Sequence, residues 1–147
     1  MEIAIRKLNK EDFHKGFFEC LFDLFSQEVG LTPLEAEEIL SRVCSNPAYC
    51  FFVAELEGKI VGAATLLIEQ KFVLKGAKFG HLEDVAVREE YRRCGIGRSL
   101  VEALSAEAER EGCHMVRLDC TEGKRAFYEK CGFKKEELTM MEKIFLK

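Results

Sequence analysis

The stretch CFFVAELEGKIVGAATLLIEQKFVL, residues 50–74, constrains the fold of this chain more than any other part of the sequence. Two long runs rich in β-branched and aromatic residues flank Glu57 and Gly58, a pair suited to a tight turn. The stretch therefore predicts a β-hairpin with long arms. Since the arms of a hairpin run antiparallel, a sheet built on them contains at least one antiparallel pair.

Strand and helix patterns alternate on both sides of this hairpin. Alternating or apolar runs predict strands at residues 2–8, 78–87, 114–120 and 133–147. Helical spacing and caps, including Asn9 and a capping box from Thr32 to Glu35, predict helices at residues 10–28, 33–44, 95–111 and 122–132. This order predicts an α/β fold on a mixed sheet, and the length favours a single domain spanning residues 1–147.

The composition is that of an ordinary globular protein, with 48% hydrophobic and 33% charged residues. A net charge of −4 argues against a nucleic-acid or membrane-surface partner, because both require a basic face. No apolar run reaches the roughly 20 residues of a membrane span. The seven cysteines include no C-x-x-C pair and the histidines lack partners at ligand spacing, so we expect reduced thiols and no metal site. A cytoplasmic location is expected, with an organelle as the alternative.

The segment HLEDVAVREEYRRCGIGRSL gathers cations where helix physics disfavours them. A helix is expected to start near Gly95, and its N-terminus carries partial positive charge, yet Arg92, Arg93 and Arg98 surround it. A bound phosphate or pyrophosphate would offset these charges, and Gly95 and Gly97 would let backbone N–H groups approach it. The alternative is a solvated basic turn whose arginines pair with nearby glutamates.

Two common phosphate loops do not fit this segment. The dinucleotide fingerprint G-x-G-x-x-G lacks its third glycine, and the G-K-[ST] of a P-loop is absent. The pattern R-x-x-G-x-G does fit, at Arg92, Gly95 and Gly97, and resembles the acetyl-CoA loop of the GNAT superfamily of N-acetyltransferases. AFYEKCGF resembles the C-terminal signature of the same enzymes. Together with GHLEDVAV and LDC, it resembles the glucosamine 6-phosphate N-acetyltransferase branch from about Lys71 to the C-terminus.

The resemblance implies the GNAT acyl-CoA N-acyltransferase fold, with a mixed, mostly antiparallel central sheet flanked by helices, and acetyl-CoA as co-substrate. In this family the loop and helix start hold the pyrophosphate, while the preceding strand pairs with the pantetheine. The coenzyme-binding residues implied are Val85, Ala86, Val87, Arg92, Arg93, Cys94, Gly95, Ile96, Gly97 and Arg98. The implied reaction acetylates glucosamine 6-phosphate on the route to UDP-N-acetylglucosamine.

The same resemblance implies three catalytic residues, Glu83, Asp84 and Tyr128. Glu83 and Asp84 are consecutive, so on a regular strand they would face opposite ways, and both reach one site only through a bulge or through a backbone contact. We assign the pair to amine recognition and proton removal, with Glu83 favoured as the acceptor. Tyr128 would donate to the leaving thiolate, because a phenol of pKa about 10 stays protonated at neutral pH. The alternatives are solvent-facing carboxylates and a core aromatic.

The substrate-binding residues implied are Lys71, Phe72, Val73, Leu74, Glu83, Asp84, Asp119 and Lys143. Lys71 and Lys143 would offset phosphate charge, and Asp119 would accept from sugar hydroxyls unless it caps the next helix. This chain has Leu74 where a histidine is common in the family and Lys143 where an arginine is common. An asparagine common before FYEKCGF is replaced by Lys124 or is missing, which affects a CoA contact. The related enzymes are homodimers whose C-terminal strand helps to build the interface, so a homodimer is expected.

Two other functions are compatible with the sequence. A GNAT enzyme could act on another amine, such as a peptide N-terminus or a polyamine. The fold could also serve as a non-catalytic acetyl-CoA-binding module in which the two carboxylates are structural. Release of CoA with each acceptor distinguishes these functions from sugar phosphate acetylation.

Overall fold

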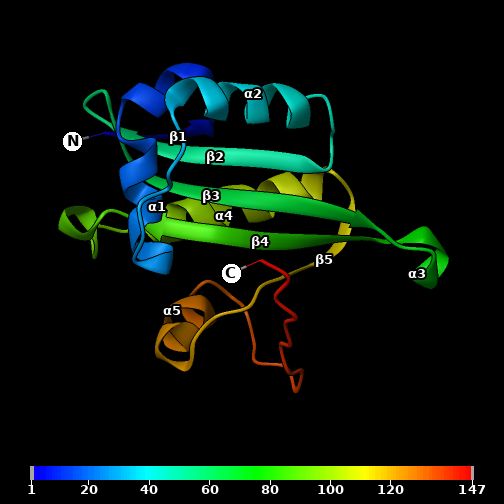
Figure 1. Ribbon diagram of the computed structural model, residues 1–147. Coiled ribbons are helices and arrows are strands. Elements are labelled where there is room, and N and C mark those ends of the chain that lie inside the picture. Colours follow the sequence, from blue (N-terminus) through cyan, green and yellow to red (C-terminus); the bar gives the residue numbers. More distant parts are fainter. Residues whose placement is uncertain (1, 147) are drawn as a thin grey trace.

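One five-stranded sheet, in the order β1-β2-β3-β4-β5, runs through the molecule (Figure 1). The computed structural model describes residues 2–146, except for the side chains of Asp23 and Phe25. The strands are β1 (Ile3–Lys7), β2 (Tyr49–Leu56), β3 (Lys59–Gln70), β4 (Lys78–Val87) and β5 (Cys113–Arg117). Neighbouring strands are antiparallel except for β4 and β5, which are parallel. The expected mixed, mostly antiparallel sheet is confirmed.

The central hairpin is confirmed as β2 and β3. Glu57 and Gly58 both have positive φ, 49° and 78°, which is the geometry of the two-residue turn that matches the twist of the flanking strands. The prediction extended the second arm too far, because β3 ends at Gln70. Beyond it, Lys71 N–H donates to Ala77 O at 2.8 Å and closes a second turn, labelled α3 (Val73–Gly76), that leads into β4.

The single helix predicted over residues 10–28 is wrong. The chain forms a short 3₁₀ helix, η1 (Lys10–His14), and then a separate helix, α1 (Phe17–Phe25). Between them Gly16 adopts a φ of 104°, and a Cβ there would lie 3.0 Å from Ile60 O. Lys15 O accepts from Ile60 N–H at 2.8 Å, so the backbone bonds to β3 instead of continuing the helical ladder.

The remaining predicted helices are present as α2 (Pro33–Val43), α4 (Ile96–Arg110) and α5 (Arg125–Lys130). The capping box of α2 is formed, with Thr32 N–H donating to Glu35 Oε2 at 2.8 Å and Glu35 N–H donating to Thr32 Oγ1 at 3.3 Å. Short 3₁₀ turns, η2 (Glu89–Tyr91) and η3 (Glu122–Lys124), precede α4 and α5. Among the helices of residues 2–146, none is long and apolar enough to cross a membrane.

The sheet buries a separate hydrophobic core on each face. Figure 1 shows α1 in front of the sheet and α4 behind it. Behind the sheet, Leu100 and Leu104 of α4 are fully buried against strand residues such as Leu66. In front, Cys20 of α1 packs with Val53 and other strand residues. Burying one leucine of this kind contributes about 2 kcal/mol. The contacts of α4 therefore stabilise the sheet from behind, and those of α1 stabilise it from the front.

The strand predicted for residues 133–147 is not formed in the described part of this segment, residues 133–146. A strand is stabilised by hydrogen bonds to a neighbouring strand. Residues 133–146 pair with none of the five strands of the sheet. Its apolar side chains are consequently exposed: Leu138, Met140, Met141, Ile144, Phe145 and Leu146. The apolar pattern was therefore recognised correctly, but the pairing that would make it a strand is missing within one chain.

Candidate active site

The strand β4 contains a bulge at the position of the two adjacent carboxylates. Glu83 lies opposite Thr65 and Ala86 lies opposite Ala63, so β4 contains one residue more than β3 between these pairs. Asp84 is the extra residue and has a left-handed φ of 51°. Of the two possibilities that the sequence left open, a bulge or a backbone contact, the structure has the bulge. Both residues line the same cavity.

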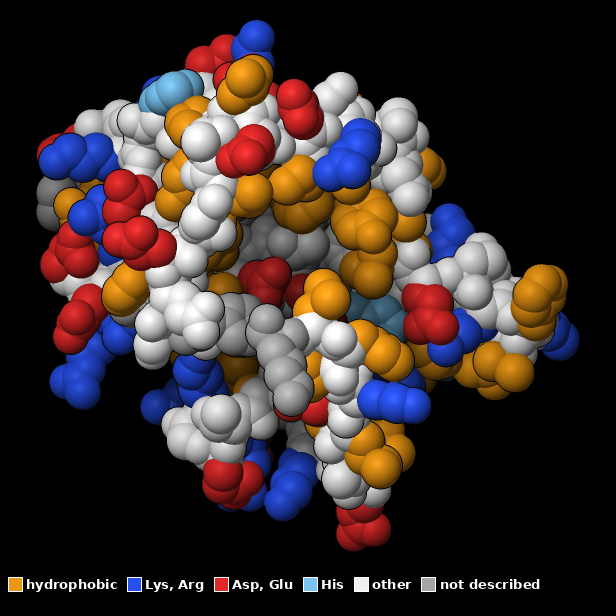
Figure 2. All heavy atoms as spheres, in the orientation of Figure 1, with side chains coloured by type: hydrophobic (Ala, Val, Ile, Leu, Met, Phe, Trp, Pro, Cys, Tyr) orange, Lys and Arg blue, Asp and Glu red, His pale blue; other side chains and the backbone are white. Residues whose placement is uncertain are grey.

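The site opens where β4 and β5 separate. Their parallel ladder ends at the pair His81 and Arg117, whereas β4 continues to Val87 and the chain after β5 turns away toward α5. Two cavities lie between the separated segments, with volumes of about 550 Å³ and about 220 Å³. We call the larger one the coenzyme cleft and the smaller one the acid cavity. Figure 2 shows a hollow on this face of the molecule with acidic side chains at its floor.

Three carboxylates converge on the acid cavity: Glu83, Asp84 and Asp119. The side chain of Glu83 remains accessible, but its partial burial raises its pKa above the ordinary glutamate value, and the charges of Asp84 and Asp119 raise it further. A carboxylate of raised pKa holds a proton more readily than a free one. This electrostatic setting suits a group that accepts a proton from an amine.

Tyr128 forms part of the wall of both cavities. Its side chain is buried, with 8% exposed, and its ring packs edge-on against Phe127 and Phe133, with centroids 4.9 Å and 6.1 Å away. Burial raises the pKa of Tyr128 to about 12. The phenol therefore stays protonated throughout the physiological range and is available as a hydrogen-bond donor at the junction of the cavities.

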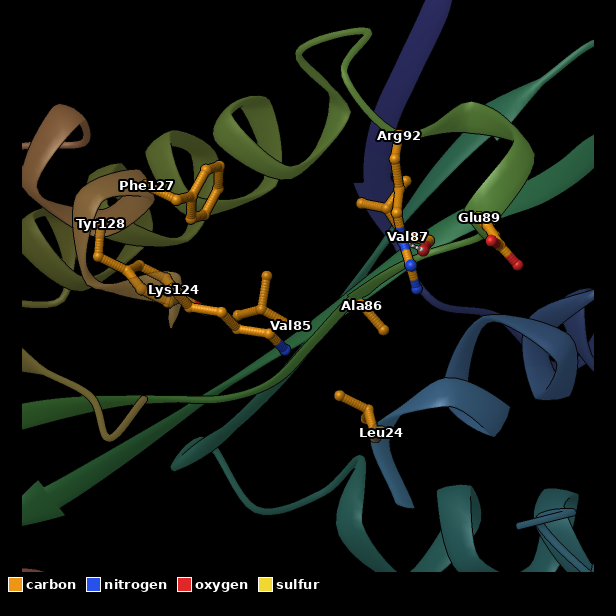
Figure 3. A pocket seen from close by; sticks show the side chains of 9 residues that line it. All are labelled: Leu24, Val85, Ala86, Val87, Glu89, Arg92, Lys124, Phe127 and Tyr128. Atoms are coloured by element: carbon orange, nitrogen blue, oxygen red, sulfur yellow. Dashed lines mark hydrogen bonds between the residues drawn. The ribbon is translucent and has the colours of Figure 1, made fainter. Parts of the chain in front are cut away.

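The predicted coenzyme strand lines the coenzyme cleft. Val85, Ala86 and Val87 form one wall, and Phe127 of α5 faces them (Figure 3). Arg92 lies at the end of this wall, where its Nε donates to Val87 O at 3.1 Å. A Cβ at Gly97 would lie only 3.2 Å from the ring of Phe127, so the glycine leaves room for that ring.

The other predicted coenzyme residues lie outside the cleft lining, at the start of α4: Arg93, Cys94, Gly95, Ile96, Gly97 and Arg98. The side chain of Ile96 is buried in the core, so only its backbone could meet a ligand. Gly95 has a φ of 79° and forms the N-cap of α4 without a side-chain hydrogen bond. Arg98 pairs with Glu102 at 2.6 Å. The alternative in which arginines pair with nearby glutamates therefore holds for Arg98, although this does not occupy the backbone N–H groups at the helix start.

Five of the predicted substrate-binding residues line neither cavity: Lys71, Phe72, Val73, Leu74 and Lys143. Lys71, Phe72, Val73 and Leu74 lie at the tip between β3 and β4, at the far end of the sheet from α5 (Figure 1). Lys71 Nζ bonds to Glu69 Oε1 at 2.5 Å, and Glu69 Oε2 bonds to His81 Nε2 at 2.8 Å. Lys143 is exposed, with its Nζ 5.6 Å from the ring centroid of Phe145. Their roles stay predictions.

The sequence interpretation missed several residues that line the cavities. Leu24 of α1 and Lys124 of η3 contribute to both cavities, and Phe127 contributes to the coenzyme cleft. Lys124 was noted only as a departure from the family. No spacing in the sequence connects Leu24 with β4, because the two approach only in the folded chain. No group of three or more potential metal ligands occurs among the residues that the structure describes.

The fold and the two joined cavities define an N-acyltransferase. A cleft along an open strand, a glycine-led helix start beside arginines and an adjoining cavity with proton-accepting groups provide one site for a coenzyme and one for an amine. The model of the Acetyltransferase (GNAT) family matches residues 3–133, and the chain belongs to that family. The GNAT fold and the class of enzyme expected from the sequence are thereby confirmed.

Similar proteins carry more specific names. The chain is 32% identical over 141 residues to glucosamine 6-phosphate N-acetyltransferase 1 of Dictyostelium discoideum, covering 94% of this chain and 88% of that protein. It is 34% identical over 139 residues to glucosamine 6-phosphate N-acetyltransferase of Arabidopsis thaliana, covering 92% of this chain and 93% of that protein. A crystal structure of the Arabidopsis enzyme superposes with a TM-score of 0.92, covering 99% of this chain and 100% of the other.

Proposed function

We propose that this chain transfers the acetyl group of acetyl-CoA to the amine of D-glucosamine 6-phosphate, forming N-acetyl-D-glucosamine 6-phosphate for UDP-N-acetylglucosamine biosynthesis. The observation that carries the proposal is the joining of the two cavities, with Tyr128 in the wall of both. The Dictyostelium and Arabidopsis relatives, which match over more than nine tenths of this chain, bear the name of this activity. A cytoplasmic setting fits the seven free cysteines.

The carboxylates of the acid cavity handle the amine in this proposal. Glu83 and Asp84 attract the ammonium form of the substrate, and Asp119 accepts from sugar hydroxyls. Glu83 takes the amine proton, through a water molecule, because its raised pKa matches it to that task better than an ordinary carboxylate. The neutral amine then attacks the carbonyl carbon of the thioester. The backbone N–H near Val85, on the wall shared by both cavities, is the donor to the oxygen that becomes negative.

The loop before α4 binds the pyrophosphate of the coenzyme in this proposal. The helix start at Gly95 offers backbone N–H groups to the pyrophosphate, and Arg92 and Arg93 offset its charge. The strand residues 85–87 face the pantetheine along the cleft. Tyr128 donates a hydrogen bond to the departing sulfur.

A second copy of the chain completes the sugar site in this proposal, with residues 1–147 acting as one domain in each copy. The apolar segment 138–146 and the apolar tip at Phe72, Val73 and Leu74 are exposed in one chain and would be covered in a homodimer. The partner would bring Lys71 or Lys143 toward the phosphate. Light scattering on a sizing column should give twice the chain mass, and removal of residues 138–147 should shift the protein toward the monomer.

A thiol-release assay tests the proposed function. Glucosamine 6-phosphate should release CoA at a high rate. Glucosamine, which lacks the phosphate, should be a poor acceptor, and glucose 6-phosphate, which lacks the amine, should be inert. Turnover on peptides or polyamines without turnover on the sugar phosphate would assign the chain to another amine. Binding of acetyl-CoA with no transfer to any amine would make it a coenzyme-binding module.

A further inference from the structure

Lys124 lies where the coenzyme cleft and the acid cavity meet. Within the described residues it is the one cation in the walls of both. Figure 3 shows its side chain extending from η3 past Tyr128 toward Val85. An acetyl group that passes from coenzyme to amine must cross this junction, so the Lys124 ammonium lies beside the place where bonds form and break.

The local structure does not account for this charge. Lys124 ends η3 and directly precedes α5, where a cation does not stabilise the helix. The next residue, Arg125, is neutralised by Glu122 at 2.6 Å and by Glu129 at 3.4 Å. By contrast, no ion pair of Lys124 occurs in the part of the chain that the structure describes. Its side chain also makes no capping hydrogen bond, so a neutral residue of similar length would fit the same backbone.

Tyr128 alone is a poor proton donor for the leaving group. Burial raises the pKa of its phenol to about 12, whereas a free thiol ionises near 8.5. Transfer of the phenolic proton to the thiolate is therefore uphill, and Tyr128 stabilises the sulfur by a hydrogen bond without giving up its proton. The negative charge on the sulfur then needs a nearby cation, since three carboxylates and Glu89 also line the joined cavities.

We propose that the Lys124 ammonium contacts the sulfur of the departing coenzyme and stabilises it as a thiolate. In this step the amine nitrogen forms a bond to the carbonyl carbon, the carbon–sulfur bond breaks and its electron pair stays on sulfur. The ammonium has by then lost its first proton through Glu83 to solvent. Glu83 takes the second proton from the nitrogen as the amide forms, and the thiolate takes a proton from solvent after it leaves. This inference rests on the proposed function and adds a catalytic residue to it.

The thiol of bound CoA reports the Lys124 charge without any turnover. Its titration, followed by the ultraviolet absorbance of the thiolate, should shift upward by about one pKa unit in Lys124→Gln, because the cation that favours the thiolate is gone. Lys124→Arg should stay near the wild-type value. The matched control is Lys130→Gln, which removes the same charge from an exposed position on α5 that lines neither cavity. An unchanged titration in Lys124→Gln overturns the inference.

Turnover supplies a second readout. Lys124→Gln should lower kcat on the order of 10- to 100-fold with little change in either KM, and acetyl thioesters of more acidic thiols should recover most of the loss. A higher KM for acetyl-CoA or for the sugar phosphate, with kcat unchanged, overturns the inference because Lys124 then binds a phosphate. A wild-type protein that does not acetylate glucosamine 6-phosphate refutes the proposed function, while the thiol titration still decides the role of Lys124.

Discussion

The coenzyme cleft and the acid cavity share a wall but offer different chemistry. The cleft is lined by strand residues 85–87, Phe127 and Arg92, so it offers a ligand shape, backbone groups and positive charge. The acid cavity is lined by Glu83, Asp84 and Asp119, so it offers a ligand ionisable carboxylates. Under the proposed function, binding of the coenzyme and proton removal from the amine would therefore depend on different groups beyond the shared wall. Some substitutions should therefore lower the affinity for the coenzyme alone, and others should lower kcat alone.

Glu83→Gln should have the largest effect. Loss of the proton acceptor should lower kcat by roughly 10²- to 10⁴-fold, because the amine must then lose its proton without a positioned base. The affinity for acetyl-CoA, measured by calorimetry, should be unchanged. The matched control is Glu89→Gln, the same change in the wall of the coenzyme cleft, which should retain near wild-type kcat. A tenfold loss of coenzyme affinity in Glu83→Gln would contradict the separation of the two cavities.

Tyr128→Phe should lower kcat by roughly 10²-fold, because one hydrogen-bond donor to the leaving sulfur is removed. The ring remains, so packing against Phe127 and Phe133 should be kept and the melting temperature should change little. Steady-state kinetics and a thermal melt measure the two quantities. Tyr91→Phe serves as the control, since Tyr91 lines neither cavity. A kcat equal to that of the wild type would show that Tyr128 is a core aromatic.

Gly97→Ala should raise the KM for acetyl-CoA about fivefold and leave kcat nearly unchanged. The added Cβ would lie 3.2 Å from the ring of Phe127 and would push that ring into the coenzyme cleft. Gly123→Ala is the matched control, because a Cβ at Gly123 meets nothing within 4 Å. An unchanged KM in Gly97→Ala would mean that Phe127 does not border the bound coenzyme.

Asp84→Asn should lower the rate and should also shift the pH profile. The shift in the pH profile should be the smallest of the effects described here. Burial and the Asp84 charge both raise the pKa of Glu83, and a base works only above its pKa, so activity falls on the acidic side. Removing the Asp84 charge lowers the pKa of Glu83 and should move the acidic limb of kcat/KM toward lower pH. Glu137→Gln, at an exposed position away from the cavities, should leave the limb in place. If the acidic limb of kcat/KM moves to higher pH, the group that titrates is not Glu83.

Local signals made most of the fold predictable. The turn at Glu57 and Gly58 and the capping box at Thr32 are decided by neighbouring residues, and both were found. The break between η1 and α1 was missed because Lys15 bonds to Ile60, which lies 45 positions along the chain. The strand expected after Gly132 was wrong because strand formation requires a partner, which a sequence pattern cannot supply.

The candidate site also contains some residues that the sequence could predict and others that it could not. Glu83, Asp84, Asp119 and Tyr128 belong to short motifs, and the folded chain gathers all four around one cavity. The bulge was one of two possibilities inferred from the sequence, the other being a backbone contact, because two adjacent carboxylates face opposite sides of a regular strand. Leu24 could not be found, since its contribution exists only when α1 lies across β4. Lys124 could be noticed as a departure, but its place between the cavities required coordinates.

The bulge at Asp84 has a consequence for how such a site can arise. Without Asp84, Glu83 and Val85 would follow one another in a regular ladder, and every later residue of β4 would keep the side of the sheet it has now. Asp84 is thus one residue inserted into β4 relative to β3, and aspartate is among the residues that tolerate its backbone conformation. Loss of a single codon here would remove one carboxylate from the acid cavity while the β3–β4 pairs on either side kept their register.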